Sequence, residues 1–226
     1  MPHKDTLVIV PIYNEADNLE FVIKDLRKYF DNILVIDDGS IDKSFIILKQ
    51  LGVNFIQHCV NIGQGAAIDS GISYFLNQTN SEFIVTFDGD GQNEAKDADL
   101  MIKHAKLLNL SAVLGSRFKN QEYSINIPFL KKITLKMARI YEQLFFNIKL
   151  TDAHNGLRII NRKLIKDFIY PIKNADMNHA TEISYKICKS KYNFEEFPVK
   201  VKYDNKRTQT PFNAINIAFK NIFYKL

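Results

Sequence analysis

The chain has 226 residues, of which 46% are hydrophobic and 24% charged, enough for one sizeable globular domain. No stretch approaches the roughly 18 apolar residues of a membrane-spanning helix, and no signal peptide precedes the first expected strand. Cys59 and Cys188 make neither a disulfide framework nor a metal pattern, which favours a reducing cytoplasm. The net charge of +5 is concentrated in residues 186–226, but no nucleic-acid-binding motif accompanies it, so we expect no nucleic-acid partner.

Strand-like and helix-like segments alternate through the first half of the chain. The expected strands are short apolar runs that end in polar residues or glycine: residues 7–11, 33–36, 53–57, 83–87 and 112–114. Between them lie segments with apolar residues at helical spacing, one of which runs from about residue 41 to Gly52. The alternation predicts an α/β fold with a mostly parallel sheet and right-handed crossovers.

The second half of the chain is less regular. Residues 128–147 are expected to form a helix whose first half carries many lysine and arginine residues. Residues 152–158 read as a polar turn, and a helix is expected near residues 179–189. Apolar and polar residues alternate from Phe197 to Tyr203, which predicts a half-buried strand.

Two carboxylates one residue apart, Asp88 and Asp90, follow the most apolar of the expected strands. In a continuing strand these side chains would share a face, and Gly89 and Gly91 let a ligand approach the backbone closely. Paired carboxylates at the carboxyl end of a buried strand suit a hard divalent cation that also holds a diphosphate. A strand that ends in a polar turn gives the same pattern, so these residues alone leave both interpretations open.

With its neighbouring motifs, the chain resembles family 2 glycosyltransferases of the GT-A fold, and most closely the dolichol-phosphate mannosyltransferase and polyprenyl-phosphate glycosyltransferase group. The matching segments are residues 10–15, 37–40, 61–67, 88–92, 115–117 and 152–158. The resemblance implies a Rossmann-like, mostly parallel sheet flanked by helices in a domain of residues 1–209. Its nucleotide-binding half would span about residues 1–118 and its acceptor-binding half about 119–209, followed by an amphipathic helix at 210–226.

The resemblance also implies roles for individual residues. Mg²⁺ or Mn²⁺ would be held on the diphosphate by Asp88, Asp90 and Gln92. The nucleotide would be bound by Pro11, Tyr13, Glu15, Asp38, Gly65 and Asp88. Phosphate or acceptor groups would meet Arg117, Arg158, Lys206 and Arg207, and the catalytic residues would be Asp90, Arg117 and Glu182. Tyr13 is also typical of packing over the sheet, and Arg158 is equally typical of a structural ion pair.

The implied reaction is metal-dependent transfer of a sugar, with inversion, from a UDP- or GDP-sugar to a polyprenyl phosphate. A phosphate monoester is already a nucleophile at pH 7, whereas a sugar hydroxyl needs a base. One alternative is therefore an enzyme that elongates a saccharide in surface polysaccharide synthesis, with Glu182 as base. An alternative of another class is a non-catalytic nucleotide-sugar-binding subunit of a membrane complex. Gln64 departs from the family pattern, which usually has lysine at this position.

Two segments combine cations with an apolar stripe, the pattern of a helix that lies at a membrane interface. These are residues 131–139 and residues 211–226. We therefore expect the protein to be cytoplasmic and peripheral to the inner face of the membrane, with a membrane-spanning partner or a homo-oligomer as a further anchor. For residues 131–139, a solvated helix face is the alternative. For residues 211–226, the alternative is packing of the stripe on the chain's own domain.

Overall fold

A seven-stranded sheet forms the centre of the computed structural model, which describes residues 2–120, 122–124, 127, 129–176 and 178–203. The strands are β1 (His3–Ile12), β2 (Phe30–Asp37), β3 (Asn54–Gln57), β4 (Phe83–Thr86), β5 (Ala112–Ser116), β6 (Arg158–Asn161) and β7 (Phe194–Pro198). Their order is β3-β2-β1-β4-β6-β5-β7. Among the strands of the described residues, only β6 runs antiparallel to its neighbours. The predicted α/β class and mostly parallel sheet are confirmed.

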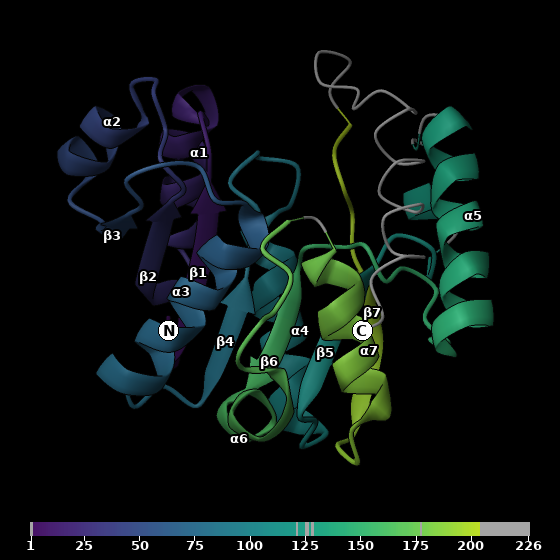
Figure 1. Ribbon diagram of the computed structural model, residues 1–226. Coiled ribbons are helices and arrows are strands. Elements are labelled where there is room, and N and C mark those ends of the chain that lie inside the picture. Colours follow the sequence, from purple (N-terminus) through teal and green to yellow (C-terminus); the bar gives the residue numbers. More distant parts are fainter. Residues whose placement is uncertain (1, 121, 125–126, 128, 177, 204–226) are drawn as a thin grey trace.

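Helices cover both faces of the sheet (Figure 1). On one face lie α1 (Ala16–Leu26), α2 (Ser44–Leu51) and α4 (Ala95–Leu107), and on the other lie α3 (Gln64–Gln78), α6 (Arg162–Leu164), the π-helical η2 (Ile165–Ile169) and α7 (His179–Lys189). The side chains of β1 alternate between the two layers: Val8 and Val10 pack with α1, whereas Leu7 and Ile9 pack with α3. A short 3₁₀ turn, η1 (Glu122–Ser124), follows β5.

Several expectations about element boundaries are wrong. β1 and β2 begin at His3 and Phe30, before the expected residues 7 and 33. The strand predicted from Phe197 to Tyr203 is β7, which ends at Pro198; beyond it the Lys202 N–H donates to Gln92 O, so the backbone pairs with the loop after β4. The polar turn expected at residues 152–158 ends in β6, whose four residues are too few to show a period. Finally, α2 begins at Ser44 rather than near residue 41.

Helix α5 (Phe129–Phe146) confirms the helix expected at residues 128–147, and it lies at the side of the molecule away from α2 (Figure 1). Its apolar stripe faces outward, with exposed fractions of 40% at Ile133, 64% at Met137, 46% at Ile140 and 76% at Leu144. Among the described residues, no helix is long and apolar enough to cross a membrane. The helix predicted at residues 211–226 lies outside the described part of the chain.

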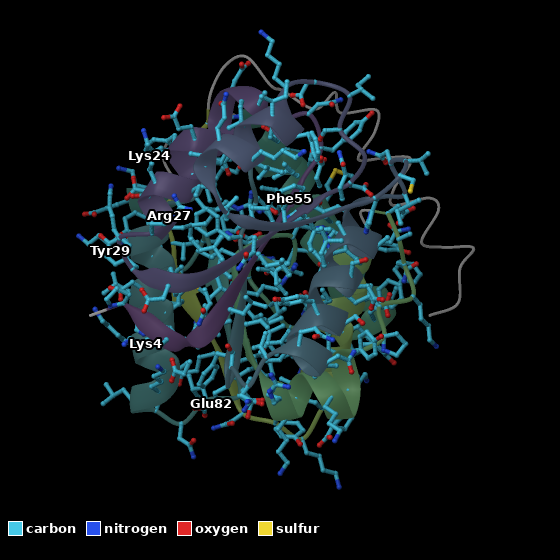
Figure 2. All side chains as sticks on the ribbon, turned by 90° about the vertical axis from the view of Figure 1, so that its left-hand side faces the viewer. Lys4, Lys24, Arg27, Tyr29, Phe55 and Glu82 are labelled. Carbon is cyan, nitrogen blue, oxygen red and sulfur yellow. The ribbon has the colours of Figure 1, made fainter. Side chains whose placement is uncertain are left out.

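The carboxyl ends of β1, β2 and β4 meet at one edge of the sheet. Their arrowheads point to the top of Figure 1, while Lys4 and Glu82, at the opposite ends of β1 and β4, lie in the lower part of Figure 2. In open α/β sheets, ligands bind outside the carboxyl ends of the strands where the strand order reverses, which here is between β1 and β4. The motifs found in the sequence lie at this edge.

Candidate active site

Asp88 follows β4 by two residues and is half-buried. Its Oδ1 accepts a hydrogen bond from Gln64 Nε2 at 2.9 Å, and a methyl group placed on Gly156 would lie 2.0 Å from its Oδ2. Desolvation by these surroundings, and then the charge of Asp90, raise the pKa of Asp88 to about 6. A bound cation would relieve this repulsion between two neighbouring carboxylates.

Asp90 and Gln92 form the turn that follows Asp88. Asp90 Oδ1 accepts a hydrogen bond from the Gln92 N–H at 3.0 Å, and Gly91 has a left-handed φ of 75°. The turn borders a cavity of about 340 Å³, which is also lined by Asn18, Lys202 and Tyr203. The predicted metal ligands are therefore close together beside open space.

The donor set fits Mg²⁺ or Mn²⁺ that shares its coordination with a diphosphate. Within the described ranges, no group of three or more His, Cys, Asp and Glu side chains is arranged to hold a metal. Two carboxylates and the amide oxygen of Gln92 are hard oxygen ligands, and Mg²⁺ is commonly held by one or two carboxylates together with substrate phosphates. The positions that the protein leaves open are thus suited to phosphate oxygens.

The glycine-rich turn before α3 packs against the chain itself. The Gly65 N–H donates to Ala175 O at 2.7 Å, and a Cβ on Gly65 would lie 2.0 Å from Asn174 O. A Cβ on Gly63, whose φ is 109°, would lie 2.3 Å from Ala175 O. Glycine is needed at both positions because residues 174–175 lie directly on the turn. The predicted contact of Gly65 with a nucleotide remains a prediction.

Asp38 holds the same turn from the side of β2. Its Oδ1 accepts hydrogen bonds from His58 Nδ1 at 2.7 Å and from the Ile62 N–H at 3.1 Å, and its Oδ2 accepts one from the Gly63 N–H at 2.8 Å. His58 Nε2 in turn lies 3.0 Å from Ser70 Oγ. These three donors leave acceptor capacity on the carboxylate for one further group.

The end of β1 supplies the other predicted nucleotide contacts. The Asp38 N–H donates to Ile12 O at 2.9 Å, which brings Asp38 next to the segment after β1. Pro11 is buried there, whereas Tyr13 is 43% exposed and offers a ring face. Glu15 Oε2 accepts a hydrogen bond from Asn18 Nδ2 at 2.9 Å. The predicted base- and ribose-binding residues therefore lie together at one side of the carboxylate pair.

Arg117 forms a buried, bidentate ion pair with Asp152. Its Nε and Nη2 each lie 2.6 Å from one Asp152 oxygen, and its Nη1 lies 3.2 Å from the Tyr203 hydroxyl. Although burial opposes the charge, the carboxylate of Asp152 keeps the pKa of Arg117 above its usual value. The predicted contact of Arg117 with phosphate stays a prediction, because here its guanidinium is bound to Asp152.

Arg158 is buried, and its charge interacts with that of Asp88. Its Nη2 donates to Ala153 O at 3.1 Å, whereas its Nη1 has no hydrogen-bond partner among the described residues. Burial lowers the pKa of Arg158 below its usual value, and the charge of Asp88 opposes this shift. Burial and the charge of Arg158 also lower the pKa of His179 to about 4, so His179 is neutral at pH 7. A buried N–H without a partner is suited to an oxygen atom of a ligand.

Glu182 holds the loop before α7. Its carboxylate accepts hydrogen bonds from the N–H groups of Lys173 and Asn174 and from Asn174 Nδ2, and it pairs with Lys186 Nζ at 2.7 Å. Although burial acts in the opposite direction, these contacts lower the pKa of Glu182. A carboxylate that accepts from four donors is a weak base. The contacts of Glu182 therefore explain its presence by a structural role, that of holding this loop.

Two predicted residues, Lys206 and Arg207, lie outside the described part of the chain. His58 and Gly156 have no predicted role, although both contact predicted site residues in the structure. The only sequence signal for Gly156 was its position in a polar segment, two residues before Arg158. His58 had none, because a single histidine without metal-ligand spacing is most often a surface or core residue.

The model of the glycosyl transferase family 2 matches residues 7–169, a span that contains the carboxylate pair, the glycine-rich turn and Arg158. The chain belongs to this family. This family 2 glycosyltransferase has the predicted GT-A fold, and its enzyme class is also confirmed.

Three known proteins illustrate the similarity. UDP-N-acetylglucosamine–dolichyl-phosphate N-acetylglucosaminyltransferase of Methanococcus voltae is 29% identical, covering 100% of this chain and 96% of its own. Polyprenol monophosphomannose synthase of Mycolicibacterium smegmatis is 26% identical, covering 73% of this chain and 64% of its own. Glucosyl-3-phosphoglycerate synthase from Mycobacterium tuberculosis, crystallised with Mn²⁺, UDP-glucose and phosphoglyceric acid, has a TM-score of 0.63 at 14% identity, covering 96% of this chain and 76% of its own.

Proposed function

We propose that this glycosyltransferase moves a sugar from a nucleoside diphosphate sugar to a polyprenyl phosphate. The observation that carries the choice of acceptor is the state of Glu182, whose carboxylate is occupied by backbone and side-chain donors of residues 173, 174 and 186. A hydroxyl acceptor needs a base, whereas a phosphate monoester with a second pKa of about 6 does not. The two polyprenyl- and dolichyl-phosphate enzymes among the similar proteins support the same choice.

The proposed reaction would use the side chains at this edge of the sheet. A divalent cation held by Asp88, Asp90 and Gln92 would stabilise the negative charge that develops on the leaving diphosphate. Tyr13, Glu15 and Asp38 would fix the base and ribose, so that the diphosphate meets the carboxylate pair. An oxygen of the acceptor phosphate forms the new bond to the anomeric carbon as the bond from that carbon to the diphosphate oxygen breaks. Attack from the opposite side inverts the anomeric configuration.

The buried cations of the site suit the acceptor's charge. Arg158 carries an N–H without a partner among the described residues, and Arg117 lies at the end of β5 near the same edge. Both would offset the negative charge of the incoming phosphate, which otherwise repels the carboxylates of Asp88 and Asp90. This gives the arginine residues a reason to lie beside a carboxylate pair.

A transfer assay tests the proposal. The purified full chain with Mn²⁺ is given radiolabelled UDP- and GDP-sugars, with undecaprenyl or dolichyl phosphate as one acceptor and an oligosaccharide as the other. We expect label in the organic phase only with a lipid phosphate present, and loss of this label with chelator. Transfer to the oligosaccharide alone would show that the acceptor assignment is wrong.

Removing the charge of Glu15 or Asp38 is expected to weaken nucleotide binding. A hydrogen bond to a charged group typically contributes about 1.5–3 kcal/mol, so Glu15→Gln and Asp38→Asn should each raise the Kd roughly tenfold or more. Calorimetry with UDP and GDP measures this for whichever nucleotide the wild type binds. Glu20→Gln, on the exposed face of α1, is the matched control. Unchanged affinity in both variants would move the base site elsewhere.

We also propose that the protein attaches to the cytoplasmic face of the membrane through α5. Its exposed apolar stripe is accompanied by Lys132, Lys136 and Arg139, as in an interfacial helix that binds anionic lipid. On the inner side of α5, buried Glu142 accepts a hydrogen bond from Thr181 of α7 at 2.9 Å, which fixes the stripe outward. Residues 211–226, and a membrane-spanning partner or a second copy, would add to this attachment.

Glutamate on the stripe of α5 is expected to release the protein from vesicles. In co-sedimentation with vesicles that contain anionic lipid, Met137→Glu combined with Leu144→Glu should lower the bound fraction several-fold, because both side chains lose apolar contact with lipid. The control is Leu107→Glu on α4, where the side chain is 82% exposed but lies on another surface. Binding that is equal with and without anionic lipid would contradict the proposal.

A further inference from the structure

We propose that Gln64 and Gly156 are positioning residues that together hold Asp88 in the orientation for metal binding. The two residues contact the same carboxylate from two different elements, the start of α3 and the turn before β6. The inference rests on the proposed metal dependence, and it adds a reason why these two residue types stand where they do.

Gln64 contacts Asp88 from a backbone segment that is held in place. It is the first residue of α3, and the next two N–H groups of this helix, those of Gly65 and Ala66, both donate to Ala175 O at 2.7 and 3.3 Å. The start of the helix is thereby tied to the loop that Glu182 holds. The Gln64 amide therefore donates to Asp88 Oδ1 from a backbone that cannot shift easily.

Gly156 contacts the other oxygen and leaves no room for a side chain. Its φ lies outside the left-handed region, so the backbone conformation alone does not require glycine. A Cβ at this position would lie 2.0 Å from Asp88 Oδ2 and 2.7 Å from its Oδ1. Gly156 O also accepts a hydrogen bond from Thr86 Oγ1 at 2.6 Å, which fixes the turn to β4 two residues before Asp88. The need for glycine thus comes from the carboxylate itself.

The neutral amide of Gln64 also preserves the charge of the carboxylate pair. An amide N–H orients Asp88 without compensating its negative charge. Gln64 therefore combines orientation of the ligand with the full negative charge that a divalent cation needs.

Mn²⁺ binding to the folded chain, measured by electron paramagnetic resonance with and without UDP, tests the inference. Losing a hydrogen-bond partner of a metal ligand typically costs about 10–100-fold in metal affinity. We expect Gln64→Leu and Gln64→Ala, which both remove the donor to Asp88, each to raise the Kd for Mn²⁺ about tenfold. The matched control is Gln78→Leu, the same substitution at the exposed far end of α3, about 20 Å away by helix rise.

The melting temperature separates positioning from folding. Gln64 variants should unfold within a few degrees of the wild type, whereas Gly156→Ala is expected to lose Mn²⁺ binding and some stability together. If the wild type binds Mn²⁺ and the Kd of both Gln64 variants stays within twofold of the wild-type value, the inference is overturned while the metal assignment stands. Absence of Mn²⁺ binding in the wild type, even with UDP, would overturn the metal assignment and the inference with it.

Discussion

Asp90→Asn is expected to lower kcat/KM for sugar transfer roughly a thousandfold, because a metal ion contributes several kcal/mol to the stabilisation of the leaving group. Asparagine keeps the size of the side chain and one oxygen that can accept the Gln92 N–H, so the turn after β4 should survive. The transfer assay with the preferred sugar nucleotide measures the loss, and thermal unfolding verifies the fold.

The matched control is Asp31→Asn. Asp31 is exposed near the start of β2, at the opposite edge of the sheet from the candidate site. Its loss removes the same charge from the protein without touching the carboxylate pair, so activity should stay near that of the wild type. Full activity of Asp90→Asn in the presence of chelator would refute the role of Asp90 in binding a metal.

Local sequence patterns predicted the edge of the sheet where the site lies. Each strand of the first half is an apolar run that stops at polar residues or glycine, and right-handed crossovers bring those ends to one edge. The segment from Phe83 to Gln92 shows both features, so its position could be inferred without any contact information. The antiparallel strand β6 could not, because a four-residue strand pairs with β4 and β5 through contacts distant in sequence.

The hydrogen-bond and packing partners of the site residues could not be predicted from the sequence. Asp38 was expected to face a nucleotide, yet its three donors come from His58 and from the turn at residues 62–63. Gly65 fits the pattern of a phosphate-binding turn, but the close approach of Asn174 O explains it. A motif shows which side chains reach the edge of the sheet. Which of them bind each other depends on loops that lie 20 residues along the chain for Asp38 and His58, and more than a hundred for Gly65 and Asn174.

Asp152→Asn is expected to lower the free energy of unfolding by about 3–5 kcal/mol, because it leaves Arg117 buried without its charged partner. The Arg117 side chain is 7% exposed and that of Asp152 is 1% exposed, so water cannot replace the lost contact. Urea denaturation measures the change. Glu20→Gln, which breaks the exposed pair with Lys24, should leave the unfolding transition unchanged within error.

A double variant separates stability from chemistry at this pair. Arg117→Met combined with Asp152→Asn removes both charges, while the asparagine oxygen can still accept the Arg117 backbone N–H bond seen at 3.0 Å. We expect it to regain more than half of the stability lost by Asp152→Asn, because residue 117 is then no longer a buried charge without its partner. If Arg117 contacts phosphate, the double variant should stay poorly active despite this recovery. If activity returns together with stability, the role of Arg117 is structural only. Of the two arginine residues proposed to contact the acceptor phosphate in the described part of the chain, Arg158 would then remain.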